Sequence, residues 1–141
     1  MENGELRATI ASSGRLTSLI HKASGREVIN GEQGGNRLVL FDDDPVLHEA
    51  WDMDVHNLEK YDEVGAATSA RIIEDGPLRV GIELEYTVGE KSRMTQRIRL
   101  AADSPRLDFE CDVSWHEWRR FLKVDFECGL RAMNATYEIQ F

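Results

Sequence analysis

The sequence has few cysteines, few prolines and no long hydrophobic run. Its two cysteines, Cys111 and Cys128, are too few for the disulfide framework of a small secreted domain, and neither lies in a CxxC or Cys/His spacing typical of structural zinc. Only 3 of the 141 residues are proline and 41% are hydrophobic, which excludes a disordered tail. The chain is therefore expected to fold as one domain or as one piece of a larger domain.

Basic side chains are fewer than acidic ones, and this disfavours nucleic acids and anionic membranes as partners. Lys and Arg number 17 against 26 Asp and Glu, which gives a formal net charge of -9 at pH 7. A chain of this sign repels nucleic-acid phosphates and anionic membrane surfaces. No apolar run approaches the roughly 18 to 20 residues that span a bilayer. We therefore expect neither nucleic acid nor a membrane as a partner.

The first residues, Met1 to Leu6, lack the basic stretch and apolar core of a signal peptide. This favours a cytoplasmic location.

What the sequence does have is period-two alternation of apolar and polar residues, with no window of helical spacing. Such alternation is typical of half-buried strands, and turn residues separate the runs. The predicted strands are 6–10, 16–20, 37–41, 67–73, 80–88, 94–100, 107–115, 122–130 and 135–141. Three hairpins are expected, joining 6–10 to 16–20, 80–88 to 94–100, and 107–115 to 122–130. Many strands without helices predict an all-β, antiparallel β-sandwich.

In the third predicted hairpin, pairing of Trp115 with Leu122 would make the two thiols diagonal neighbours. Cys111 and Cys128 lie on apolar faces at strand spacing, so we interpret both as buried core residues rather than catalytic ones. Trp115 and Trp118 flank the connection. One hypothesis is that these two tryptophans form an aromatic platform for a sugar ring. For Trp115, packing in the core is the favoured interpretation.

The segment from Pro45 to Glu63 breaks the alternation and predicts a long loop. Residues 48–56 within it hold two imidazoles and three carboxylates. The zincin pattern requires histidines at i and i+4 on a helix, but Asp52 follows His48 at that spacing. A solvated acidic loop is therefore favoured over a metal site, and no catalytic or metal-binding residue is assigned in this chain.

Several segments, in order along the whole chain, resemble the C-terminal β-domain of glycoside hydrolase family 38, the α-mannosidases. These segments are Gly14–Leu19, Gly25–Val28, Gly35–Asp43, Ala50–Asp52, Asp112–Glu117, Leu122–Val124 and Ala135–Phe141. One departure is that His48 and Glu49 stand where the family often has an aromatic residue and an Asp.

The resemblance implies a partial supersandwich of the galactose-mutarotase type, with residues 1–141 as the first half of the mannosidase C-terminal β-domain. It further implies that the parent enzyme hydrolyses terminal α-linked mannose with zinc, and that its nucleophile and zinc ligands lie in an N-terminal catalytic domain that this chain lacks. The expected partners are that missing catalytic domain and a mannose-containing glycan.

Within this framework we expect the chain alone to be inactive and to support the catalytic domain. We also expect Trp51, Asp52 and Asp54 to bind substrate, because an indole face packs on a pyranose while carboxylates accept its hydroxyl protons. The alternative for Trp51 is a plug at the end of the sandwich. The alternative for the whole chain is a freestanding carbohydrate-binding or structural β-sandwich module. As a fragment, an interrupted sandwich would expose sheet edge and apolar face, which favours pairing with itself or with another chain.

Overall fold

The computed structural model describes residues 1–48 and 53–137. Strands dominate this part of the chain, and a single 3-10 helix, η1, is the one helical element in it. The elements are β1 (Leu6–Ile10), β2 (Leu16–His21), β3 (Arg26–Glu27), β4 (Arg37–Asp42), η1 (Val55–Glu59), β5 (Tyr61–Glu63), β6 (Ser69–Asp75), β7 (Arg79–Val88), β8 (Ser92–Ala101), β9 (Leu107–Ser114) and β10 (Arg120–Asp125). Over the described residues, no helix has the length and apolar character needed to cross a membrane.

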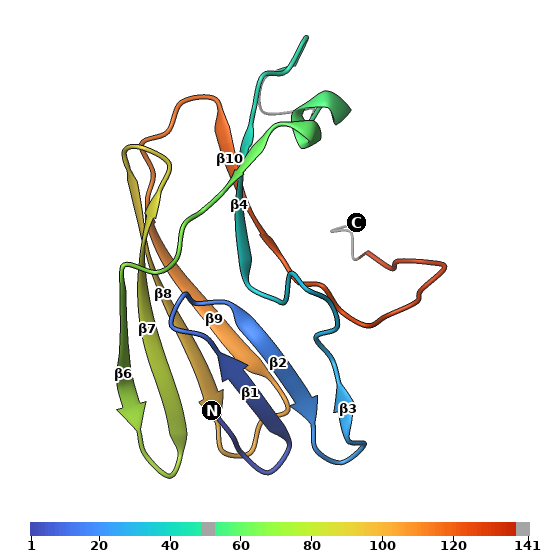
Figure 1. The fold of residues 1–141 in the computed structure, drawn as a ribbon, viewed down its shortest axis with the longest axis vertical. Coiled ribbons are helices and arrows are strands. Elements are labelled where there is room, and N and C mark those ends of the chain that lie inside the picture. The colour runs from blue at the N-terminus through green and yellow to red at the C-terminus, as the bar shows by residue number, and fades with distance from the viewer. Residues whose placement is uncertain (49–52, 138–141) are drawn as a thin grey trace.

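The strands form three antiparallel sheets, which confirms the predicted all-β architecture. Their orders are β6-β7-β8-β9, β10-β4-β5 and β1-β2-β3. The largest core cluster joins Leu38 and Leu40 of β4 to Leu84 of β7 and Ile98 of β8, so the sheet that contains β4 packs on the four-stranded sheet. A second cluster, of Ala8, Leu16 and Ile29, packs the β1-β2-β3 sheet near the start of β9 (Figure 1).

Two of the three predicted hairpins are confirmed, and the third is wrong. β1 pairs with β2, and β7 pairs with β8 in register from Arg79↔Ala101 to Val88↔Ser92. Over residues 1–48 and 53–137, β9 pairs with β8 alone, whereas β10 pairs with β4. The polar connection after β9 therefore carries the chain from one sheet to the other. In this position Leu122 of β10 packs against the core cluster that contains Leu38 and Leu40 of β4, so the connection places β10 beside an already buried strand.

The broken hairpin also changes the environment of the cysteines. Cys111 is exposed and Cys128 is half-buried, so the prediction of two core thiols is wrong for Cys111. Trp115 is likewise exposed instead of packed in the core. Of the predicted strand at 135–141, residues 135–137 form no strand, and residues 138–141 lie outside the described residues.

A pair of buried amides links the two layers. The Asn36 Nδ2 donates to the Gln96 Oε1 at 2.7 Å, and the Gln96 Nε2 donates to the Asn36 Oδ1 at 3.0 Å. Asn36 Nδ2 also donates to the Gly14 carbonyl at 2.9 Å. Both side chains are almost fully buried, so their hydrogen bonds offset the cost of removing two amides from water.

The turn before β2 sits directly on a buried tyrosine. Gly14 has φ +91°, and a Cβ built there would lie 1.8 Å from the Tyr86 hydroxyl oxygen. Tyr86 is buried in the core, and this burial raises the pKa of its hydroxyl to about 12. The phenol therefore occupies the space that a side chain at position 14 would need, and glycine is required there for two separate reasons.

Gly14→Ala should lower the free energy of unfolding by at least about 2 kcal/mol, because the new methyl group requires a left-handed backbone and displaces Tyr86. Gly25→Ala is the matched control, since Gly25 has φ +64° with nothing within 4 Å of the place that a methyl group would take. The Gly25→Ala variant should lose only the free energy of holding alanine in a left-handed backbone conformation, about 1 kcal/mol. Urea unfolding of the purified protein measures both. Equal losses would show that Tyr86 does not oppose a side chain at position 14.

Candidate functional site

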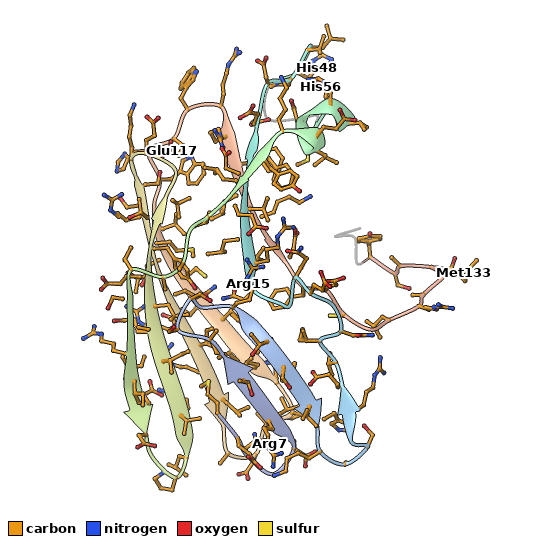
Figure 2. The ribbon with its side chains drawn as sticks, in the orientation of Figure 1. Arg7, Arg15, His48, His56, Glu117 and Met133 are labelled. Atoms are coloured by element: carbon orange, nitrogen blue, oxygen red, sulfur yellow. The ribbon has the colours of Figure 1, made fainter. Side chains whose placement is uncertain are left out.

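Two connections come together at one end of the molecule: the acidic loop between β4 and β5, and the 115–119 turn between β9 and β10. Figure 2 shows His48, His56 and Glu117 at this end. The Asp43 amide donates to the Arg119 carbonyl at 2.8 Å, and the Arg119 guanidinium pairs with the Asp44 carboxylate. These contacts join the loops because the pairing of β4 with β10 brings the ends of both strands side by side.

Among the predicted sugar-binding residues, Asp54 has a clear local structural role. Its Oδ2 accepts a hydrogen bond from the Val46 amide at 2.9 Å, and its carbonyl accepts from the Asn57 amide at 3.0 Å. Asp54 thus closes the loop and begins η1. Trp51 and Asp52 lie outside the described residues, so their predicted role in sugar binding stays a prediction.

Large apolar side chains are exposed on the described part of the acidic loop. The most exposed are Val46, Leu47 and Val55. Carboxylates of the same loop lie near them in the sequence, Asp44 before Val46 and Asp54 before Val55, so this end of the molecule carries both apolar surface and negative charge. Such a mixture suits contact with another macromolecular surface or with the apolar and hydroxylated faces of a sugar.

An open cavity of about 540 Å³ lies beside this loop, between the β7-β8 turn and the start of β10. Trp118 lines it with 83% of its surface exposed. Arg120 lines it as well, and its Nη2 donates to the Asp62 Oδ2 at 2.6 Å. The Arg120 Nε is buried and has no hydrogen-bond partner among the described residues. An indole face beside carboxylates and a guanidinium can stack on a pyranose ring and hydrogen-bond its hydroxyls.

Glu117 has a structural task at the rim of this cavity. Its Oε1 accepts hydrogen bonds from the Lys91 amide at 2.7 Å, the Ser92 amide at 3.0 Å and the Ser92 hydroxyl at 3.1 Å. A side chain at Gly89 would collide with the same carboxylate. The Lys91 amide is the largest cause that lowers the pKa of Glu117, and Ser92 adds to it. The carboxylate therefore closes the β7-β8 turn.

Sequence reasoning brought Trp118 forward but missed Asp62 and Arg120 as its neighbours in the cavity. These residues meet only through the pairing of β4 with β5 and β10, which joins distant parts of the chain. The described residues contain no group of three or more His, Cys, Asp or Glu side chains that could hold a metal ion. Within those described residues, the two loop histidines His48 and His56 belong to no such group.

Comparison with known proteins gives a consistent result along the full chain. A family model described as the glycosyl hydrolases family 38 C-terminal domain matches residues 1–141. Alpha-mannosidase 2C1 of Homo sapiens is 40% identical over 142 residues, which cover 100% of this chain and 14% of the relative. Alpha-mannosidase 2C1 of Mus musculus is 39% identical with the same coverage. Alpha-mannosidase G of Dictyostelium discoideum is 40% identical over 146 residues, 100% of this chain and 13% of the relative. The chain thus spans only a small part of the length of these relatives.

Glu117→Gln should destabilise the protein at neutral pH and flatten the pH dependence of its stability. Because folding lowers the pKa of Glu117, its carboxylate stabilises the fold above the unfolded-state pKa, and this stabilisation is lost as the pH falls through the folded-state pKa. Thermal unfolding between about pH 7 and pH 3 measures the effect. Glu90→Gln, which removes the same charge from the same turn, should change the profile less. Identical profiles for both variants would contradict this role of Glu117.

Proposed function

The chain belongs to the glycosyl hydrolase family 38 C-terminal domain family, and on that basis we propose that it is a non-catalytic β-sandwich segment of an α-mannosidase. The proposed parent reaction is hydrolysis of terminal α-linked mannose. The match of the family model to all 141 residues carries the proposal, together with curated relatives that are alpha-mannosidases. Because the chain covers 13 to 14% of the lengths of those relatives, the reaction chemistry is assigned to the rest of the polypeptide.

Zinc belongs to this proposal as a cofactor of the parent enzyme, held by its catalytic domain. The described residues do not fit a zinc site, since they offer no group of three ligands. The zinc ligands and the nucleophile of the parent enzyme are therefore assigned to the rest of the polypeptide. The segment instead supports the catalytic domain and shapes the approach of the glycan.

The end of the molecule that carries the acidic loop is the part we assign to the glycan. The cavity beside Trp118 offers an exposed indole, the Arg120 guanidinium and carboxylates, which suit a neutral polyhydroxylated ligand. Asp54 holds the loop together through the Val46 amide. The proposed sugar-contacting residues remain Trp51, Asp52 and Asp54, with the indole packing on the ring and the carboxylates accepting hydroxyl protons.

The segment on its own should hydrolyse no aryl α-mannoside and should retain no stoichiometric zinc after gel filtration. The reason is that three convergent protein ligands are needed to hold a catalytic zinc and to activate its bound water. A chromogenic mannoside assay and metal analysis of the purified 141-residue chain measure both properties. Turnover that a point substitution within the chain removes would contradict the non-catalytic role.

In the full-length enzyme, Trp51→Ala should lower kcat/KM on a mannoside by about tenfold or more, a loss of roughly 1.4 kcal/mol of transition-state binding. The melting temperature should stay within a few degrees of wild type. Tyr137→Ala, which removes an exposed aromatic ring from another part of the chain, is the control and should leave the kinetics unchanged. A large fall in stability with unchanged kinetics would assign Trp51 to the core.

A further inference from the structure

Charges alternate in sign from strand to strand across the outer face of the four-stranded sheet. The register places Arg71 of β6 opposite Glu83 of β7, Glu83 opposite Arg97 of β8, and Arg97 opposite Glu110 of β9. The Arg97 Nε donates to the Glu83 Oε2 at 2.9 Å, and its Nη1 donates to the Glu110 Oε1 at 3.3 Å. Arg71 pairs with Glu83 from the other side, which leaves Glu83 buried beneath two guanidinium groups. Each strand thus meets opposite charge on its neighbour.

The alternation stops at β9 on an acidic strand. Asp108, Glu110 and Asp112 all lie on this outer face, with much of each carboxylate exposed. Their described ion pairs run back toward the inner strand β8 or to Arg106 in the turn before β9. In the described part of the chain, no strand pairs with the other edge of β9. The other strand pairs of this sheet place opposite charges side by side on this face. A strand that followed the same pattern next to β9 would carry basic residues there.

The inner face of the same edge is apolar and uncovered. A cavity of about 290 Å³ separates β9 from β10, lined by Phe109, Cys111 and Val113 on one side and by Leu122, Val124 and Phe126 on the other. Val113 is 45% exposed, Val124 49% and Phe126 41%. Phe109 and Phe126 meet edge to face across this groove, with ring centroids 5.5 Å apart, but Val113 and Val124 beside them stay about half exposed. The edge of β9 therefore combines unpaired backbone, an acidic outer face and an apolar inner groove.

We propose that the open edge of β9 receives a further strand from another part of the longer polypeptide. This strand carries Lys or Arg at alternate positions beside Glu110 and Asp112, and apolar residues between them that fill the groove against Val113 and Phe126. Strand addition supplies backbone hydrogen bonds, while the alternating side chains set the register. The proposal depends on the proposed function only in taking the chain as a segment of a longer protein.

The same observations argue against a second copy of this chain as the occupant. Antiparallel pairing of two β9 strands would set the acidic residues 108, 110 and 112 of one copy beside those of the other, and like charges on facing positions destabilise a sheet. A strand from the same polypeptide also needs no concentration-dependent association, because tethering gives it a high effective concentration. With 13 to 14% of the relatives' lengths covered, most of each relative lies outside the aligned region and can supply such a strand.

Labelling of Cys111 in the full-length wild-type protein tests whether the groove is filled. Cys111 is an exposed residue that lines the groove, and the added strand would cover it. Maleimide modification, quantified by mass spectrometry of the peptide that contains residue 111, should be at least about 100-fold slower in the native protein than in urea. Native labelling within about tenfold of the unfolded rate would show an open groove and overturn the proposal.

Photo-crosslinking identifies the occupant. Val113→p-benzoylphenylalanine in the full-length protein should crosslink to one peptide of the same polypeptide that carries Lys or Arg at alternate positions. The matched control is Ile72→p-benzoylphenylalanine on β6, the opposite edge of the same sheet, which should not give that crosslink. Mixing isotopically heavy and light protein separates crosslinks within one chain from those between chains. Heavy-light products, a peptide without the basic alternation, or no crosslink would each overturn the proposal.

These measurements do not use catalysis as a readout, so they separate the two proposals. A full-length protein that shows the expected crosslink but no mannosidase activity would sink the proposed function and leave the added strand in place. An active mannosidase with a freely labelled Cys111 would do the reverse.

Discussion

The two-layer arrangement depends on the reciprocal amide pair between Asn36 and Gln96. Asn36, directly before β4, has a left-handed φ of 54°, and its side chain lies against the opposite sheet. There it reaches both the Gln96 amide of β8 and the Gly14 carbonyl of the turn before β2. One side chain thus ties all three sheets together. A buried amide without its partner costs about 1 to 3 kcal/mol, so these hydrogen bonds select one relative placement of the layers.

Hairpins between strands adjacent in the chain could be predicted from the sequence, because their alternating strands and turn residues lie next to one another in it. The alternation over 80–88 and 94–100, with a glycine turn between them, predicted β7 and β8 in the correct pairing. The partner of β10 could not be found in this way. Period-two alternation shows that Leu122 and Val124 need an apolar layer, but it does not show whether β9 or β4 supplies the neighbouring backbone.

The location of the candidate site could be predicted from the sequence, but the roles of its individual residues could not. The break in alternation after Pro45 marked where the acidic loop begins, because loops interrupt the strand period. The prediction of a loop as far as Glu63 is wrong, since η1 and β5 form within it and β5 pairs with β4. What Asp54 and Glu117 do could not be deduced from their neighbours in sequence. Each carboxylate accepts from main-chain amides elsewhere, Asp54 from Val46 and Glu117 from Lys91 and Ser92. Such contacts depend on how turns approach one another in space, and residue types do not record this.

The pairing of β4 with β10 has a consequence for the order of folding. Arg120 of β10 donates to the Leu40 carbonyl of β4, 80 positions away in the sequence, whereas β6, β7, β8 and β9 each pair with a strand adjacent in the chain. Loop-closure entropy delays distant contacts relative to local ones. The β4-β10 pair therefore carries the largest loop-closure cost of the strand pairs formed by the described residues. On a ribosome, β4 can pair with β5 and pack on the four-stranded sheet before β10 has emerged to complete its sheet.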